Sequence, residues 1–236
     1  LKSISKFYFF FGLQFLYFSQ LINKDLLTIL FFIFFLKNLI FKNYKQILFL
    51  SFLFFFVRIQ LLIFGFITIF ISRGNFKKRV LLTYLTTSII AAIISVKAGL
   101  ISSSSLGNGF SSFLIQINKS YYYLGYLIFN PLRIIQFLVD IYMSFNIYTE
   151  GLIDVAKILR IPLLILLMLH FKSIFNFFIN LKSVNDSKVM SLNVIVVAFT
   201  LTWLMNPTIN ARYVMLIVPF LILLGRYVKI NRKLIF

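Results

Sequence analysis

Eight long apolar runs follow one another along the chain, separated by short polar stretches. A hydrocarbon core about 30 Å thick is crossed by roughly 20 residues of α-helix at about 1.5 Å per residue, which is close to the length of most of these runs. The runs lack the alternation of apolar and polar residues that is typical of strands, so they predict helices. They cover residues 7–22, 26–41, 47–72, 80–96, 121–144, 152–171, 189–205 and 211–228. The sequence therefore predicts an all-α fold, a polytopic transmembrane helix bundle that forms a single integral membrane domain over residues 1–236, with six to eight hydrophobic segments.

The composition favours a lipid environment. Of the 236 residues, 61% are hydrophobic and 12% are charged, whereas soluble domains have roughly 45–50% and about 25%. The net charge of +19 would suggest a nucleic-acid partner in a soluble protein. Here the lysines and arginines gather between apolar runs, as the positive-inside rule and anionic headgroups favour. We therefore expect membrane lipid as a partner and no nucleic acid.

Side chains that hold metals or cofactors are scarce. The chain has no cysteine and a single histidine, His170, and it contains no glycine-rich nucleotide-binding motif and no metalloprotease motif. We expect neither a bound metal nor a cofactor. Charged side chains at membrane depth are costly in lipid and indicate functional sites, so the search for a site begins with them.

At the run 47–72, a single membrane crossing conflicts with the positions of the neighbouring basic clusters. A basic cluster ending at Lys45 precedes it and another beginning at Arg73 follows it, so a single crossing would place the clusters on opposite sides. Arg58 interrupts the run near its middle. A broken, re-entrant segment that enters and leaves on one side removes the conflict. Such a break survives at membrane depth only where protein buries it or water reaches it.

A second run, at 121–144, is interrupted by Asn130, Pro131 and Arg133. Proline removes a backbone donor and kinks helices, so this run is also predicted to be broken or re-entrant. Six crossings then remain and all basic clusters become cytoplasmic. The external stretches are then the loop at 97–120 and the segments 145–151 and 206–210. The alternative is a single tilted helix in each place, with arginines that snorkel to the interface.

Arginines within the apolar runs are the first candidates for a site. Arg58 is the deepest charge in the sequence, and its guanidinium suits bidentate binding of phosphate or pyrophosphate. The alternative is a structural pair with a carboxylate such as Asp140. Arg133, which follows a proline, is a similar candidate. Asp140 is the best candidate for a catalytic acid because it lies late in the same run, with a local salt-bridge network as the alternative.

A polar turn before the last apolar run is the second candidate. It reads Asn206-Pro207-Thr208-Ile209-Asn210-Ala211-Arg212-Tyr213 and leads into the final helix. Free backbone N–H groups and the positive end of the helix dipole favour anions, so Arg212 with Tyr213, Asn206 and Asn210 forms a candidate phosphate cradle. The alternative is an anchoring arginine beside an interfacial tyrosine.

Three strings carry a resemblance to a known family. They are Arg58-Ile59-Gln60-Leu61-Leu62, the loop from Gly107 to Phe113 ahead of Asn130-Pro131-Leu132-Arg133, and Asn206-Pro207 with Ala211-Arg212-Tyr213. In these strings the chain resembles the C-terminal half of the Wzy-type O-antigen or capsular polysaccharide polymerases. That family has more helices and longer chains, and this chain begins with Leu1, so the resemblance implies that N-terminal helices are missing here.

The resemblance implies polymerisation of lipid-linked oligosaccharide repeat units at the external face of the bacterial inner membrane, by a multi-pass glycosyltransferase. A growing glycan would move from one undecaprenyl-pyrophosphate carrier onto another lipid-linked unit, while Arg58, Arg133 and Arg212 stabilise the departing diphosphate. The implied partners are the undecaprenyl-pyrophosphate-linked glycan, a flippase and a chain-length regulator protein. Two other classes stay open: a transporter or channel subunit whose broken helices form a midplane site, and a noncatalytic subunit of a larger membrane complex.

Overall fold

Long helices dominate the described part of the chain. The structure is a computed structural model that describes residues 24–97, 120–121, 125–132, 148–149, 152–153, 161, 165, 168–169, 171–172, 187–205 and 211–233. Its helices are α2 (Lys24–Ile40), α3 (Tyr44–Leu53), the 3₁₀-helix η1 (Phe54–Phe56), α4 (Ile59–Ser72), α5 (Phe76–Lys97), α10 (Ser187–Trp203) and α11 (Ala211–Lys233). Two short strands, β1 (Tyr148–Thr149) and β2 (Leu152–Ile153), pair antiparallel. The helical character agrees with the all-α prediction.

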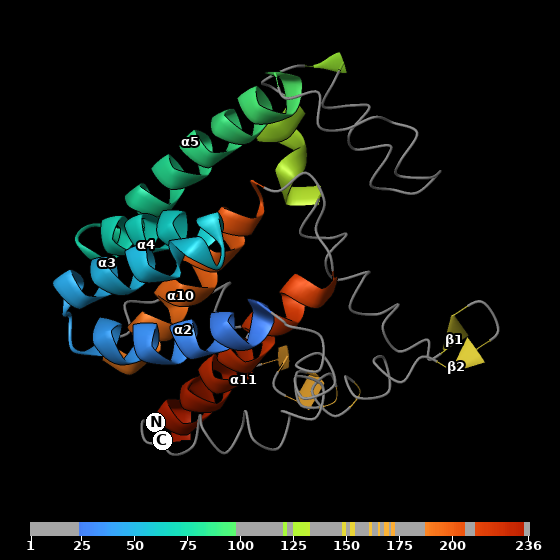
Figure 1. Ribbon diagram of the computed structural model, residues 1–236. Coiled ribbons are helices and arrows are strands. Elements are labelled where there is room, and N and C mark those ends of the chain that lie inside the picture. The colour runs from blue at the N-terminus through green and yellow to red at the C-terminus, as the bar shows by residue number, and fades with distance from the viewer. Residues whose placement is uncertain are drawn as a thin grey trace.

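Four predicted runs coincide with single helices (Figure 1). They are 26–41, 80–96, 189–205 and 211–228, which correspond to α2, α5, α10 and α11. The run at 152–171 was expected to be helical from its start, but it opens with strand β2. The paired residues are Tyr, Thr, Leu and Ile, and two residues separate the strands, which is the commonest length of a hairpin loop. The run at 7–22 lies outside the described residues.

The run at 47–72 is broken, as predicted. Helix α3 ends at Leu53, η1 follows, and α4 begins only after Arg58, whose backbone is extended at φ −152° and ψ 125°. Helices α3 and α4 pack against each other and form a hairpin. The Arg73 guanidinium lies over the Tyr44 ring, 4.8 Å from its centroid, so the end of α4 returns to the start of α3. The chain therefore enters and leaves this segment at the same end.

A small-residue contact holds the hairpin close. Gly65 of α4 lies against Ser51 of α3, and a Cβ added at Gly65 would stand 2.7 Å from the Ser51 Cβ and nearer still to its Oγ. Ser51 is fully buried, and its hydroxyl donates to the Ile47 carbonyl at 2.8 Å. Small residues permit this kind of close backbone approach between helices, as they do in membrane proteins.

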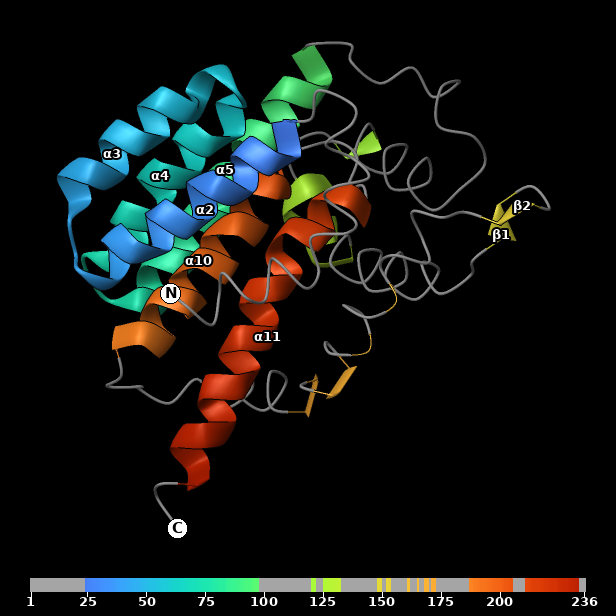
Figure 2. The same ribbon diagram turned by 60° about the horizontal axis from the view of Figure 1, so that its bottom comes forward.

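The hairpin brings most basic residues of these helices to one end of the bundle. The α2–α3 connection, the α4–α5 connection and the start of α10 meet there, and α11 runs antiparallel to α10, so that its C-terminal half points the same way (Figure 1; Figure 2). We call this the basic end; its residues are Lys37, Lys42, Lys45, Arg73, Lys77, Lys78, Arg79, Lys188 and Arg226. Lys24 and Lys97 lie at the other ends of α2 and α5, and Arg58 lies at the tip of the hairpin. That all the predicted basic clusters lie on one side of a membrane stays a prediction.

Phenylalanines fill the core between these helices. Phe32 of α2 contacts Phe64 of α4 edge to face at 5.2 Å between centroids, and it reaches Phe199 of α10 at 5.7 Å and Phe220 of α11 at 5.6 Å. All four are buried. Aromatic pairs at these separations add about 0.5–1.5 kcal/mol each beyond burial of area. The Phe32 side chain of α2 therefore packs against residues of three other helices, α4, α10 and α11.

The surface of the bundle is strongly apolar while small polar side chains lie inside. Phe49, Phe52 and Phe56 of the hairpin are 66%, 62% and 79% exposed, whereas Thr28 and Thr68 are fully buried. Large exposed apolar side chains continue along α4 and α5. Within the described residues, no helix combines the length and the hydropathy that a membrane crossing demands.

Candidate functional site

Arg58 occupies the break at the tip of the α3–α4 hairpin. Its N–H donates to the Phe54 carbonyl at 3.1 Å, and its own carbonyl accepts from Leu61 N–H at 3.0 Å, so its backbone closes both the end of η1 and the first turn of α4. The residue is half-buried, and its Nε atom is buried. The two hydrogen bonds therefore hold the backbone of Arg58 at the break.

The break has features that suit an anion. Arg58 precedes the first residue of α4, where unpaired backbone N–H groups and the positive dipole end lie. Helix α3 contains 10 residues, which at about 1.5 Å each puts the tip roughly 15 Å from the basic end. That is about half of a 30 Å hydrocarbon core.

The other predicted site residues are only partly located. Arg212 and Tyr213 lie in the first turn of α11, and their side chains are outside the described set. The positions of Arg133, Asp140, Asn206 and Asn210 are also outside it, so an Arg58–Asp140 pair stays a prediction. The hairpin tip and the start of α11 both lie away from the basic end (Figure 1). The structure thus puts Arg58 and the backbone of Arg212 on the same side of the bundle.

The predicted break near Pro131 lies at the edge of the described residues, which reach only Leu132, so it stays a prediction. Residues 125–132 are helical through Pro131. Proline has no N–H to give to the carbonyl four residues earlier, which is that of Leu127. The Tyr84 hydroxyl of α5 donates to this carbonyl at 2.5 Å, and one turn along α5 the Ser88 Oγ accepts from Asn130 Nδ2 at 2.9 Å. Helix α5 therefore supplies the hydrogen bond that proline removes, and residues 125–132 keep a helical backbone.

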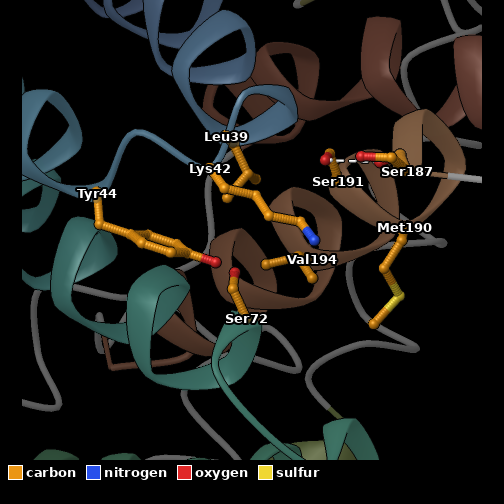
Figure 3. A pocket seen from close by; sticks show the side chains of 8 residues that line it. All are labelled: Leu39, Lys42, Tyr44, Ser72, Ser187, Met190, Ser191 and Val194. Atoms are coloured by element: carbon orange, nitrogen blue, oxygen red, sulfur yellow. Dashed lines mark hydrogen bonds between the residues drawn. The ribbon is translucent and has the colours of Figure 1, made fainter.

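A pocket at the basic end was not predicted from the sequence (Figure 3). Its volume is about 210 Å³. Lining residues come from α2, the α2–α3 connection, α3, the end of α4 and the start of α10; they are Leu39, Lys42, Tyr44, Ser72, Ser187, Met190, Ser191 and Val194. In Figure 3 the Lys42 ammonium and the Tyr44 hydroxyl both point toward the space that these residues enclose. These residues are spread over more than 150 positions, so no local motif marks the pocket.

Metal binding finds no support in the part of the chain that the structure describes, where no three His, Cys, Asp or Glu side chains gather. Comparison of the sequence and structure with protein-family models, with curated proteins and with solved structures finds no match. Inference about function therefore depends on the two cationic sites, at Arg58 and at Lys42.

Proposed function

We propose that the chain is a multi-pass protein of the bacterial inner membrane. Its exposed surface carries many phenylalanine, leucine and isoleucine side chains, and threonine, serine and asparagine lie buried among the apolar residues of its interior. Collection of the basic residues at one end matches the positive-inside rule, which makes that end cytoplasmic. The tip of the hairpin and the start of α11 then face the membrane interior and the external side.

Within that membrane, the proposed activity is polymerisation of undecaprenyl-pyrophosphate-linked oligosaccharide repeat units. The observation that carries it is Arg58, fixed in an extended backbone at the tip of a hairpin whose two ends meet. A guanidinium at a helix break binds the oxygens of a diphosphate bidentately. Arg133 and Arg212 are proposed to assist from the external side, with Asn206, Asn210 and Tyr213 contacting the carrier or the glycan.

The reaction needs no external energy source because the carrier bond is already activated. The anomeric carbon of the growing glycan loses its bond to the diphosphate oxygen and gains one to a hydroxyl oxygen of the acceptor sugar. The hydroxyl proton passes to a carboxylate, for which Asp140 is the candidate, and undecaprenyl diphosphate leaves with its charge held by arginine. Loss of one such stabilising donor typically lowers a rate by about 10²–10³-fold.

Replacement of Arg58 tests this function. We expect Arg58→Ala to collapse the surface polysaccharide of a producing cell from a ladder of long chains to a core with a single repeat unit, at unchanged protein level. Arg58→Lys keeps the charge but not the planar fork, so it should recover only short chains. Lys45→Ala, at the opposite end of α3, is the matched control and should leave the ladder intact.

Two outcomes decide between functional classes. An unchanged ladder in Arg58→Ala or after deletion of the gene contradicts the polymerase. Loss of all repeat units, including the first, would indicate that the chain moves the lipid-linked unit across the membrane, as a transporter with a broken-helix site does.

A further inference from the structure

The pocket at the basic end carries hydrogen-bond donors from three separate elements. Lys42 supplies an ammonium, Tyr44 a phenol and Ser187 a hydroxyl. The Ser72 hydroxyl already donates to the Thr68 carbonyl at 2.6 Å, so its oxygen is left to accept. Lys42 and Ser187 are exposed, which leaves the pocket open to a ligand from outside.

Lys42 is held over the pocket by an unusual backbone. Its φ is 54°, in the left-handed region that favours glycine. Lys42 N–H donates to the Leu39 carbonyl at 3.0 Å, and Asn43 N–H donates to the Asn38 carbonyl at 2.9 Å. This pair of bonds is the Schellman pattern that ends many helices, and glycine is its usual residue at this position. A side chain here costs about 1–2 kcal/mol, so Lys42 lowers the stability of the fold relative to glycine at this position.

The surroundings of the pocket are positive. The Arg73 guanidinium lies over the Tyr44 ring, so a second positive charge stands beside the pocket. The start of α10 lies at the pocket, where its first N–H groups and its dipole favour an anion. No carboxylate is present among the described lining residues. The nearest acid along the chain, Asp186, lies outside the described residues.

We propose that this pocket binds a phosphate group at the cytoplasmic end of the bundle. Three donors of different geometry around one space suit the oxygens of a phosphate monoester or diester. The volume of about 210 Å³ far exceeds the roughly 10–15 Å³ that one water needs, and it leaves room for a few atoms beyond the phosphate. The ligand is either a soluble phosphate or the headgroup of an anionic phospholipid. The proposal does not depend on glycan polymerisation, because the pocket and Arg58 lie at opposite ends of the hairpin.

Two binding measurements on the purified full chain test the proposal and separate the sources. In detergent, inorganic phosphate is titrated and followed by ³¹P NMR. In nanodiscs, retention of phosphatidylglycerol over phosphatidylcholine is measured by native mass spectrometry. We expect Lys42→Gly to weaken the interaction with whichever probe binds by about tenfold or more, because it removes a charged donor. Tyr44→Phe, which keeps the ring under Arg73, should weaken it several-fold, since one neutral donor is lost.

Two controls separate an effect at the pocket from a change in net charge and from a loss of folding. Lys45→Ala removes an equal charge from an exposed side chain that does not line the pocket, and it should change binding by less than about twofold, as a surface charge in salt does. Lys42→Gly relieves the left-handed backbone and so should remain folded. If Lys42→Gly weakens the binding of inorganic phosphate and Lys45→Ala does not, the pocket is a site for a soluble phosphate. If Lys42→Gly instead loses phosphatidylglycerol selectively and Lys45→Ala does not, the pocket is a site for a lipid headgroup. Equal losses in the two variants, or no loss in Lys42→Gly with either probe, overturn the proposal.

Discussion

The contact between Gly65 and Ser51 gives a test in which packing and helix propensity predict opposite signs. Alanine in place of a glycine inside a helix is worth about 0.8–1 kcal/mol of added stability from propensity alone. In this structure the new Cβ would lie 2.7 Å from the Ser51 Cβ, whereas carbon atoms prefer about 3.5–4.0 Å. The two helices must then separate by about 1 Å, and overpacking of this kind costs about 1–3 kcal/mol.

We therefore expect Gly65→Ala to lower the free energy of unfolding by about 1 kcal/mol, after propensity is subtracted from overpacking. Ser51→Gly returns the space, so the double variant should show a coupling of about 1–2 kcal/mol in a mutant cycle. The assay is equilibrium unfolding in detergent, followed by circular dichroism and by the fluorescence of Trp203, the single tryptophan, which stacks on Phe199 at 4.0 Å.

A control calibrates the assay. Thr86 is exposed on α5, so Thr86→Ala should raise stability by a few tenths of a kcal/mol through propensity alone, about the difference between threonine and alanine. Should Gly65→Ala also stabilise the chain, by the amount that propensity predicts, the hairpin is not closely packed and the reasoning fails.

Three further predictions follow from single contacts. Tyr84→Phe should lower the free energy of unfolding by about 1–3 kcal/mol, because the carbonyl that Pro131 leaves without a helical donor loses its partner. In a Pro131→Ala background the same change should leave the free energy of unfolding nearly unchanged. An equal loss in both backgrounds would contradict this reasoning. Lys42→Gly should raise the free energy of unfolding by about 1 kcal/mol, checked by the same unfolding assay, since glycine adopts the left-handed backbone without strain. Cysteines placed at Lys45 and Lys77, in a chain that has no others, should react with an impermeant maleimide from the same side of the membrane; labelling from opposite sides would refute the re-entrant hairpin.

The sequence predicts the helices and the break, because both depend on local pattern and on charge. Apolar runs bounded by polar residues give α2, α5, α10 and α11 within a few residues of their ends. The break at Arg58 follows from the conflict between two basic clusters that one crossing would separate. Long apolar runs have no periodicity to indicate which face is buried, so the pairing of helices was not predictable from the sequence.

The remaining features depend on contacts between distant residues. The carbonyl that Pro131 leaves without a helical donor is bonded by Tyr84, which lies 47 positions before the proline, and local rules do not indicate this partner. The pocket joins Lys42 to Ser187 across 145 positions, and nothing near either residue indicates the other. Strand β2, which replaces the start of a predicted helix, is an exception, because only two residues separate it from its partner β1.

The close hairpin links the two candidate sites mechanically. The contact between Gly65 and Ser51 sets the distance between α3 and α4, and this distance lets Arg73 reach the Tyr44 ring at one end and fixes Arg58 at the other. Separation of the helices should therefore weaken phosphate binding at the basic end and disturb the site at the tip together. Lys42→Gly acts at one end only and Arg58→Ala at the other, so a Gly65 variant that impairs both sites while these variants impair one each would establish the hairpin as the element that positions them.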